Sequence, residues 1–370
     1  MDDVFKLADD LGPLKVIHVH EPGSGLKGVL VVDNVARGPS VGGVRMAPDV
    51  TTEECARLAR AMTFKNAAAD LPHGGGKAVL VGDPKMPREQ KQVLIRGFCN
   101  ALREVEQYIF APDMGTDEEC MAWVKDEIDR VVGLPRELGG IPLDEIGATG
   151  FGLRHAVEVA QEFSGIDIGG ARFVIQGFGA VGRHAAKFLT DAGAVAVAVS
   201  DSKGTICNPD GLDIDRLLAF KAEGKSVTEY DEGERRDGDA IVDIDCDIWI
   251  PAARPDVIHE GNVNRLSTRM VVQGANIPVT YAAEKILHER GILNVPDFIA
   301  NAGGVICAAA EYQGSSETAA FGAIEEKLRR NTREVLETAR REKILPRDAA
   351  LAMARGRVEK AMRHRRWHIF

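Results

Sequence analysis

The first part of the chain alternates between two patterns of hydrophobic positions. Short runs rich in β-branched residues, Lys15–Val19 and Gly28–Val32, predict strands. Residues 51–70 instead have helical spacing, and they open with Thr51-Thr52-Glu53-Glu54, the spacing of a capping box at a helix start. We therefore expect mixed strands and helices up to about Ile146, where glycine-rich sequence precedes a new helical pattern.

The second part of the chain is more regular. Residues 171–250 alternate strand, helix and strand, as the βαβ units of a parallel sheet do. An amphipathic, highly charged pattern from Glu325 to Arg366 predicts one or two helices. The expected fold class is α/β with two lobes, residues 1–146 and a Rossmann-type domain over 147–325, followed by a helical segment over 326–370. Ligands often bind between domains, so we expect the site in a cleft between the lobes.

Composition narrows the function classes. Lys and Arg number 46 against 56 Asp and Glu, a net charge of −10, which argues against binding to nucleic acid. Hydrophobic residues make up 45% and charged residues 28%, as in ordinary soluble globular proteins. The acidic start Met1-Asp2-Asp3-Val4 has no character of a targeting segment, and no charge-free run is long enough to span a membrane. We expect neither a nucleic acid nor a membrane partner.

The cysteines point to a reducing compartment. None of the six has metal-site spacing with another cysteine or with a histidine, so no metal site is expected. Buried or incidental thiols are typical of such a chain. The expected location is the cytoplasm.

A glycine-rich turn supplies the strongest motif. Residues 171–176 read as a strand, and they lead directly into Gly177-Phe178-Gly179-Ala180-Val181-Gly182 and a helix over 183–191. A second strand over 194–200 ends on Asp201. In this context the first glycine makes the tight turn, the second lets backbone amides approach a pyrophosphate, and the third lets the helix pack against the strand. The pattern predicts a dinucleotide-binding site.

Asp201 bears on the choice of cofactor. Its carboxylate would accept hydrogen bonds from ribose hydroxyls and repel a 2′-phosphate, which favours NAD. Ser202 and Lys203, directly after it, could instead hold that phosphate, so NADP stays open.

Lys65 lies on what the helical spacing predicts to be an apolar stripe. Leu58, Ala61, Met62 and Lys65 fall at i, i+3, i+4 and i+7. One interpretation is a lysine whose stem packs while its ammonium reaches water. The other is a cation that points into a cleft and holds a carboxylate.

A second lysine, Lys77, follows Gly74-Gly75-Gly76 and opens a hydrophobic strand. The run is not a phosphate-binding P-loop, because Leu71 and Ala78 stand where that motif needs Gly and Ser or Thr. A desolvated lysine can act as acid or base near neutral pH, whereas a turn lysine is merely solvated. Asp113 follows a predicted strand over 108–111, a place typical of catalytic groups but also of turn aspartates.

Several motifs occur together: Gly38–Arg45, Met62–Lys65, Leu71–Lys77, Ala111–Asp113, Ala148–Gly150, Gly274–Asn276 and Pro296–Gly304. In these motifs the chain resembles the glutamate/leucine/phenylalanine/valine dehydrogenases, which are NAD(P)-dependent amino acid dehydrogenases. The resemblance runs from about Gly38 to the C-terminal helix. It implies a first lobe for substrate binding and oligomerisation, a C-terminal helix that returns to that lobe, and a homo-oligomer, commonly a hexamer or octamer.

The resemblance also implies roles for individual residues. Lys65 would bind the substrate α-carboxylate, Lys77 would polarise the reacting carbon and activate water, and Asp113 would shuttle protons. Further implied positions are Gly42, Met62, Val41 and Ala308 toward the substrate, and Thr149, Ala252, Ala253, Asn276 and Asn301 toward the cofactor. The implied reaction converts an L-amino acid, water and NAD(P)+ into a 2-oxo acid, ammonium and NAD(P)H.

Two departures bear on the substrate. Glutamate-specific members carry a lysine where this chain has Val41 and a serine where it has Ala308. Without these partners a buried side-chain carboxylate would cost at least a few kcal/mol, so an apolar amino acid is favoured. By contrast, Val199–Gly204 and Arg347–Ala350 look more like glutamate-type members. Phe151 and Gln273 also depart from the common arginine and glutamate.

Three functions therefore stay open. The favoured one is a dehydrogenase for apolar L-amino acids, and the alternative is a glutamate dehydrogenase. The third is a catalytically silent nucleotide-binding paralogue. The presence of Lys65, Lys77 and Asp113 together argues against this third function.

Overall fold

The computed structural model describes residues 5–364. The acidic segment Met1–Val4 and the last residues of the predicted C-terminal helical region, 365–366, lie outside the described residues. The chain divides into two compact units. Unit 1 comprises residues 1–142, 307–320 and 351–370, and unit 2 comprises 143–306 and 321–350.

Unit 1 is built on a five-stranded mixed sheet in the order β1-β2-β4-β3-β5. β1 and β2 pair antiparallel, as do β2 and β4, whereas β3 is parallel to both β4 and β5. The strands are β1 Lys15–Glu21, β2 Leu26–Asn34, β3 Ser40–Ala47, β4 Gly74–Val81 and β5 Tyr108–Pro112. The predicted strands at 15–19 and 28–32 thus form the edge strand and its neighbour.

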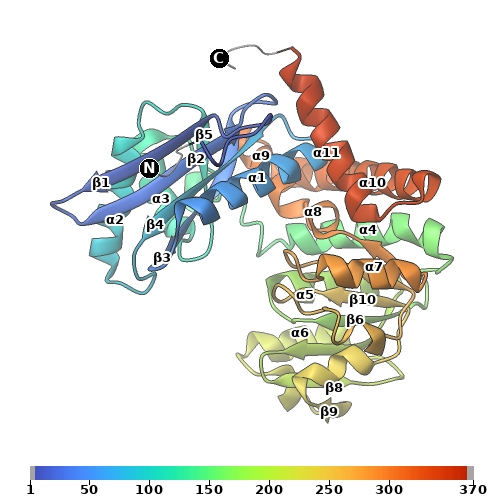
Figure 1. Ribbon diagram of the computed structural model, residues 1–370. Helices are drawn as coiled ribbons and strands as arrows, with labels where there is room; N and C mark the ends of the chain where they lie inside the picture. Colours follow the sequence, from blue (N-terminus) through green and yellow to red (C-terminus); the bar gives the residue numbers. More distant parts are fainter. Residues whose placement is uncertain (1–4, 365–370) are drawn as a thin grey trace. The chain divides into compact units, whose positions relative to one another are not determined.

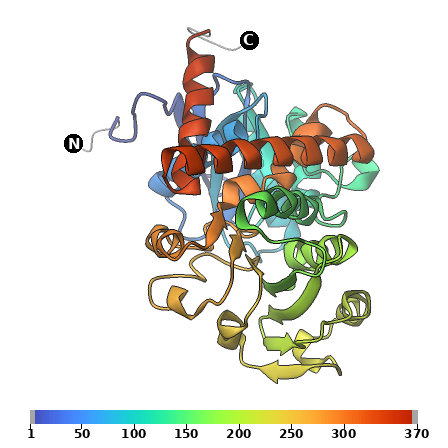
Figure 2. The ribbon, with the colours of Figure 1, turned by 90° about the vertical axis from the view of Figure 1, so that its right-hand side faces the viewer.

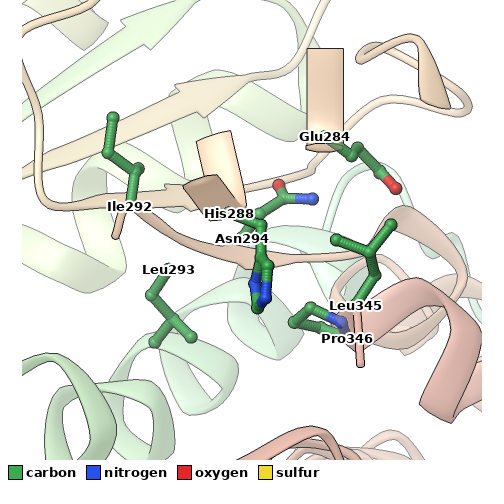
Figure 3. Close-up of a pocket in the computed structure, with 7 residues that line it drawn as sticks. All are labelled: Glu284, His288, Ile292, Leu293, Asn294, Leu345 and Pro346. Carbon is green, nitrogen blue, oxygen red and sulfur yellow. The ribbon is translucent and has the colours of Figure 1, made fainter. Parts of the chain in front are cut away.

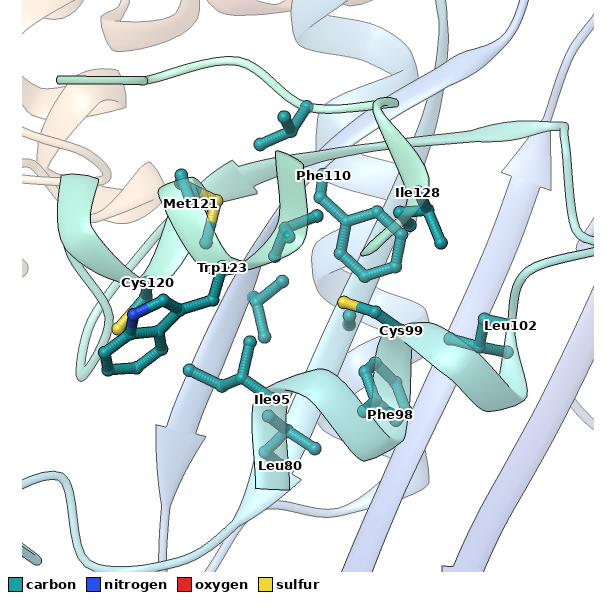
Figure 4. Close-up of a cluster of buried hydrophobic side chains, with 14 of the residues drawn as sticks. Leu80, Ile95, Phe98, Cys99, Leu102, Phe110, Cys120, Met121, Trp123 and Ile128 are labelled. Atoms are coloured by element: carbon teal, nitrogen blue, oxygen red, sulfur yellow. The ribbon is translucent and has the colours of Figure 1, made fainter. Parts of the chain in front are cut away.

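Helices cover both faces of this sheet (Figure 1). α2 (Arg88–Ala101) and α3 (Glu118–Ile128) pack on one face through a buried cluster that includes Phe98, Phe110 and Met121 (Figure 4). The rings of Phe98 and Phe110 meet edge to face at a centroid distance of 6.4 Å. α1 (Thr52–Ala68) packs on the other face through Cys55 and Ala59. Both faces of the sheet are therefore covered within one unit.

α1 begins where the sequence predicts but buries a different face. The Thr51 hydroxyl accepts a hydrogen bond from the Glu54 amide and caps the helix. The buried residues are Cys55, Ala59, Thr63, Asn66, Ala67 and Ala68. The predicted stripe through Leu58, Ala61, Met62 and Lys65 is wrong, because Ala61 is exposed and the others are half-buried. Small side chains face the sheet since they let the helix approach it closely.

The three glycines before Lys77 are strand residues and not a flexible turn. Gly74, Gly75 and Gly76 all belong to β4 and are buried. A Cβ at Gly75 would lie 2.0 Å from the Thr63 amide nitrogen, and one at Gly74 would lie 1.8 Å from the Asn34 carbonyl oxygen. Glycine is needed here because α1 and β2 come too close to the strand for any side chain.

Unit 2 contains a seven-stranded sheet in the order β12-β11-β10-β6-β7-β8-β9. The first five strands are parallel, and β8 and β9 extend the sheet antiparallel. The strands are β6 Arg172–Gln176, β7 Val195–Asp201, β8 Gly204–Cys207, β9 Glu234–Arg236, β10 Ile248–Pro251, β11 Met270–Val272 and β12 Leu293–Val295. This is the doubly wound arrangement that the βαβ pattern predicts.

Helices α4 (Ala148–Ser164), α5 (Ala180–Asp191), α6 (Ile214–Ala222), α7 (Tyr281–Glu289) and α8 (Asp297–Ala300) surround this sheet. A buried cluster built from Val174, Trp249, Val271 and Leu287 joins the central strands to α7. α5 begins at Ala180, three residues before the predicted start.

The remaining helices differ from the expected division at 146 and 325. α9 (Gly303–Tyr312) and α11 (Pro346–Met362) each begin in unit 2 and end in unit 1. α10 (Glu317–Glu342) falls almost entirely in unit 2, where it runs beside α4 (Figure 2). Arg329 pairs with Glu158 and Arg333 with Glu162 across these helices. Only the part of α11 from Leu351 returns to unit 1, where Arg357 donates to the carbonyls that end α1.

Over residues 5–364, no helix is both long and apolar enough to cross a bilayer.

All six cysteines are buried, and burial raises the pKa of the Cys55 thiol to about 12.

Candidate active site

Two strands of unit 1 bring a lysine and an aspartate into contact. Lys77 lies in the middle of β4 and Asp113 directly follows β5, on the opposite sides of β3. The Lys77 Nζ lies 2.6 Å from the Asp113 Oδ2, and the lysine is only 6% exposed. Burial alone would raise the pKa of Asp113, but the charge and hydrogen bond of Lys77 and the charge of Arg45 outweigh it and lower that pKa. The contact with Lys77 therefore favours the ionised form of Asp113, whose side chain is 24% exposed.

Arg45 and Thr116 hold the aspartate from the other side. The Arg45 Nε donates to the Asp113 Oδ2 at 3.1 Å, while its Nη1 donates to Glu54 on α1 at 2.7 Å. The Thr116 hydroxyl accepts from the Asp113 amide at 3.0 Å and donates to the Val44 carbonyl at 2.8 Å. Asp113 therefore has a fixed orientation toward Lys77.

Glycine between the two strands makes this contact possible. A Cβ at Gly43 would lie 2.6 Å from the Asp113 Cβ and 3.3 Å from the Lys77 Nζ. A Cβ at Gly42 would lie 1.8 Å from the Gly76 carbonyl oxygen. Gly42 thus keeps the strands close, and Gly43 leaves room for the ion pair.

An apolar cluster adjoins the pair along the same strands. Val41, Ile109 and Val132 are buried together, and Ala111 and Ala308 pack against them. Val41 lies opposite Ile109 in the β3–β5 register, and Gly43 lies opposite Ala111. The structure thus brings together Val41 and Ala308, both of which the family resemblance places toward the substrate. The cluster contains hydrocarbon side chains alone.

Lys65 and Met62 occupy the last turns of α1. Both are half-buried, and Lys65 is the basic residue at the helix C-terminus. A cation at this end of a helix is favourable because the helix dipole places partial negative charge there.

In unit 2 the glycine-rich turn has the geometry that a pyrophosphate requires. Gly177 has a φ of +99°, and a Cβ there would lie 2.6 Å from the Ala253 Cβ. A Cβ at Gly182 would lie 1.9 Å from the Gly177 carbonyl oxygen. Gly179 differs: it caps α5, and a Cβ there would meet no atom within 4 Å. The fold itself requires glycine at 177 and 182. Gly179 instead leaves space at the N-terminus of α5, which fits a dinucleotide phosphate.

Asp201 ends β7 as predicted, but its carboxylate is already fully engaged. Oδ1 accepts from the Lys203 amide and the Ser226 hydroxyl, both at 2.9 Å. Oδ2 accepts from the Lys221 Nζ at 2.5 Å and the Val227 amide at 3.0 Å. Burial would raise the pKa of Asp201, but these donors, Lys221 foremost, lower it. Lys203, Lys221 and Lys225 line a hollow of about 450 Å³ beside the carboxylate.

Two asparagines from separate loops of unit 2 meet. The Asn301 Nδ2 donates to the Asn276 Oδ1 and to the Ala275 carbonyl, both at 3.1 Å. The Asn301 Oδ1 is buried without a partner, an acceptor available to a ligand. Thr149 lies in the first turn of α4 close to Gly304, where a Cβ would be 3.2 Å from its hydroxyl. Ala252 continues β10, and its amide donates to the Gln176 carbonyl at 2.7 Å.

Sequence reasoning missed part of this machinery. Arg45, Gly43 and Thr116 flank Asp113, and Ile109 and Val132 complete the apolar cluster. Arg45 and Gly43 lie within the motif Gly38–Arg45, so an arginine two residues after paired glycines was the available signal. Ile109 and Val132 carry no such signal, because buried branched residues occur throughout the sheet.

A parallel sheet with this glycine-rich turn in one unit, and a Lys–Asp ion pair in the α/β sheet of the other, are the features of a dinucleotide-dependent dehydrogenase. The comparisons agree. Residues 13–130 match the family model of the Glu/Leu/Phe/Val dehydrogenase dimerisation domain, and residues 139–366 match that of Glutamate/Leucine/Phenylalanine/Valine dehydrogenase. The chain belongs to this family and is an NAD(P)-dependent amino acid dehydrogenase that acts on the CH–NH₂ group.

Curated relatives carry the name glutamate dehydrogenase. That of Aeropyrum pernix is 38% identical over 358 residues, covering 90% of this chain and 85% of the relative. That of Thermotoga maritima is 42% identical, covering 75% and 70%. The NADP-specific glutamate dehydrogenase of Saccharolobus shibatae is 39% identical, covering 74% and 67%.

Solved structures share the fold. The hetero-hexameric glutamate dehydrogenase of Thermus thermophilus, in a leucine-bound form, matches with a TM-score of 0.83 and 29% identity over 96% of this chain and 91% of that one. The L-tryptophan dehydrogenase of Nostoc punctiforme has a TM-score of 0.76 at 23% identity, over 95% and 97%, and so shows the fold alone.

Proposed function

We propose that this enzyme catalyses the reversible oxidative deamination of an L-amino acid with an apolar side chain. The observation that carries the choice of substrate is the cluster of Val41, Ile109 and Val132 with Ala111 and Ala308, in strand register with the Lys77–Asp113 pair. This cluster offers neither a cation nor a hydroxyl to a side-chain carboxylate. A glutamate side chain buried there would cost several kcal/mol.

Within this proposal, four charged residues of unit 1 have defined roles. Lys65 holds the α-carboxylate as a point charge, and Lys77 polarises the reacting carbon and orients water. Asp113, 2.6 Å from Lys77, accepts and returns protons, and Arg45 keeps it ionised and oriented. A bound NAD(P)+ would supply the hydride acceptor. Gly177–Gly182 would hold its pyrophosphate, and Thr149, Ala252, Asn276 and Asn301 would line the rest of its site.

Glutamate is the second candidate substrate, favoured by the names of the relatives at 38–42% identity. The test is nicotinamide reduction across all L-amino acids, with NAD+ and NADP+ in parallel. Turnover of leucine, valine or phenylalanine with little on glutamate supports the proposal. Turnover of glutamate above these replaces it with the second candidate, and a bound cofactor with no turnover in the panel would favour the silent paralogue.

We also propose that the enzyme accepts NADP in addition to NAD, the cofactor that the sequence favours. The argument for NAD rests on the charge of Asp201, and Lys221 neutralises that charge at 2.5 Å. The hollow is lined by Lys203, Lys221 and Lys225 together with Asp201 and Glu229, so its lysines outnumber its carboxylates beside the place where a phosphate would lie. Lys203→Ala leaves the backbone amide that anchors Asp201, so we expect KM for NADP to rise about tenfold with KM for NAD unchanged. Lys285→Ala, on α7 of the same unit, is the matched control, and equal effects on both cofactors would refute a phosphate role.

We propose a homo-oligomer, in keeping with the dimerisation domain matched by residues 13–130. The similar Thermus thermophilus enzyme is a hetero-hexamer, which supports assembly of several chains but not their identity. Light scattering coupled to size exclusion measures the mass. A monomer at micromolar concentration would contradict this proposal.

A further inference from the structure

This inference rests on the proposed cofactor role of Asn276 and concerns the residue that follows it. Ile277 has a φ of +43°, the left-handed region, which is costly for a β-branched side chain. Its side chain is 54% exposed, so burial of the side chain does not hold it there. Some other contact must hold this backbone conformation.

Asp297, the first residue of α8, supplies that contact. The Asp297 Oδ2 accepts from the Ile277 amide at 2.8 Å, and the Asp297 backbone carbonyl accepts from the Asn301 amide at 2.7 Å. Asn301 in turn reaches Asn276 and Ala275. The segment 274–277, which we call the cofactor loop, is thus held on one side by α8 and the residue after it. On the other side the Pro251 carbonyl accepts from the Gly274 and Ala275 amides at 2.9 and 2.8 Å, and the Asp256 amide donates to the Ile277 carbonyl at 3.0 Å. Asp297 is the side chain that fixes the Ile277 amide.

Asp297 is itself held by an arginine far away in sequence. The Arg347 Nη2 donates to the Asp297 Oδ1 at 2.9 Å, and its Nε donates to the Glu284 Oε2 at 2.7 Å. The carboxylates are 7% and 1% exposed, and the arginine is 14% exposed. One guanidinium therefore lies between two buried carboxylates and donates to both.

Gln273 completes the network. Its Nε2 donates to the Glu284 Oε1 at 2.6 Å and to the Asn294 Oδ1 at 3.0 Å, and its Oε1 accepts from Arg347 at 3.2 Å. A glutamate at 273, the common family residue, would place a third carboxylate against Glu284. The neutral amide instead donates to Glu284 and accepts from Arg347, so Arg347 faces two carboxylates and not three, which accounts for this departure.

The surroundings leave no room for another ligand in this region. Figure 3 shows Glu284, His288 and Asn294 around Leu345 and Pro346, just before Arg347. The hollow they line is about 30 Å³, enough for a water or two and too small for an organic molecule. The network is built to hold the chain in place.

We propose that Arg347 is a positioning residue for the cofactor loop: it fixes Asp297, Asp297 fixes the left-handed backbone of Ile277, and Ile277 sets the place of Asn276. Within residues 5–364, the hydrogen bonds and ion pairs of Arg347 go to Glu284, Gln273 and Asp297 and not to residues 274–277. Its effect on cofactor binding is therefore indirect.

The test combines Arg347→Met with Ile277→Gly. Arg347→Met should weaken NAD(P)H binding, measured by nicotinamide fluorescence, about tenfold. Ile277→Gly alone should bind within about twofold of the parent chain, because glycine adopts positive φ without help. In the Arg347→Met background, Ile277→Gly should restore most of the lost affinity. A merely structural role for Arg347 predicts a loss that glycine does not restore, and that result would overturn the proposal.

A second readout does not depend on the cofactor. In the ligand-free protein, hydrogen exchange of the 274–280 segment should accelerate about tenfold or more in Arg347→Met, since the Ile277 amide loses its fixed acceptor. The matched control is Arg290→Met, because Arg290 also bridges two carbonyls of unit 2, those of Val263 and Leu266, at 2.6 Å each. It should leave both the exchange of 274–280 and the affinity unchanged. Equal acceleration in both variants would refute the relay.

If Arg347→Met does not fold, Asp297→Asn decides the question with the same two readouts and the same glycine rescue. A parent chain that binds no nicotinamide would refute the proposed function, whereas the exchange measurement still reports on the relay. Cofactor binding in the parent chain with unchanged exchange and affinity in folded Arg347→Met would refute the relay alone.

Discussion

The Lys77 ammonium and the Asp113 carboxylate lie 2.6 Å apart across a strand whose glycine leaves them room to meet. A general base needs both reach to its proton and a defined protonation state. Lys77 and Arg45 give Asp113 both, because they keep it ionised and fix its direction.

Lys77→Ala should lower the turnover number by about 10²–10⁴-fold, because the reacting carbon loses its cation. Nicotinamide binding to unit 2 should persist, since the glycine-rich turn contains no contact to Lys77. Steady-state kinetics and a fluorescence titration measure the two effects. Lys125→Ala, an exposed lysine of unit 1 paired with Asp129, is the control. Substantial residual turnover in Lys77→Ala would contradict the proposed mechanism.

Asp113→Asn should lower the free energy of unfolding at neutral pH by about 2 kcal/mol, less than for a fully buried pair because the side chain is 24% exposed. The pKa of Asp113 is lowered from 3.8, so its stabilisation is present above pH 3.8 and disappears as the pH falls through the lower folded-state value. The difference between the parent and variant chains should stay constant from pH 7 to about pH 5 and shrink below pH 3.8. Urea unfolding at each pH measures it, and a difference that grows on acidification would contradict the ion pair.

Val41→Lys should raise kcat/KM for glutamate by at least about tenfold, roughly 1.4 kcal/mol, because it supplies a cation to the apolar cluster. Ala308→Ser in addition should raise it further. Val41→Met is the control for size without charge and should give no gain. Absence of any gain in a folded Val41→Lys variant would count against the apolar assignment of this cluster.

Two glycines of one motif should respond differently to alanine. Gly179→Ala should unfold within about 0.5 kcal/mol of the parent chain, because its Cβ meets nothing, yet bind nicotinamide about tenfold more weakly. Gly182→Ala should lose about 2 kcal/mol of stability, because its Cβ would lie 1.9 Å from the Gly177 carbonyl oxygen. Chemical denaturation and fluorescence titration separate the two effects. Normal nicotinamide affinity in Gly179→Ala would contradict the proposal that this turn binds the cofactor phosphate.

Local signals in the sequence determined much of this protein. The Thr51 cap, the strand before Gly177 and Asp201 at the end of the next strand depend on spacing over a few residues, and the structure has them where the spacing predicts. The buried face of α1 was predicted wrongly because small residues, and not the largest apolar ones, let it approach the sheet.

Contacts between distant segments were decided by the tertiary structure alone. Arg45 reaches Asp113 across 68 positions, and Arg347 reaches Asp297 across 50. Lys221 neutralises Asp201 only because the chain returns past β7 after 20 residues. Hydrophobic periodicity reports which side of an element is buried, but it carries no information on which charged side chain meets it there. The sequence by itself therefore determined the class of chemistry, and the packing of strands and helices decided which partners orient it.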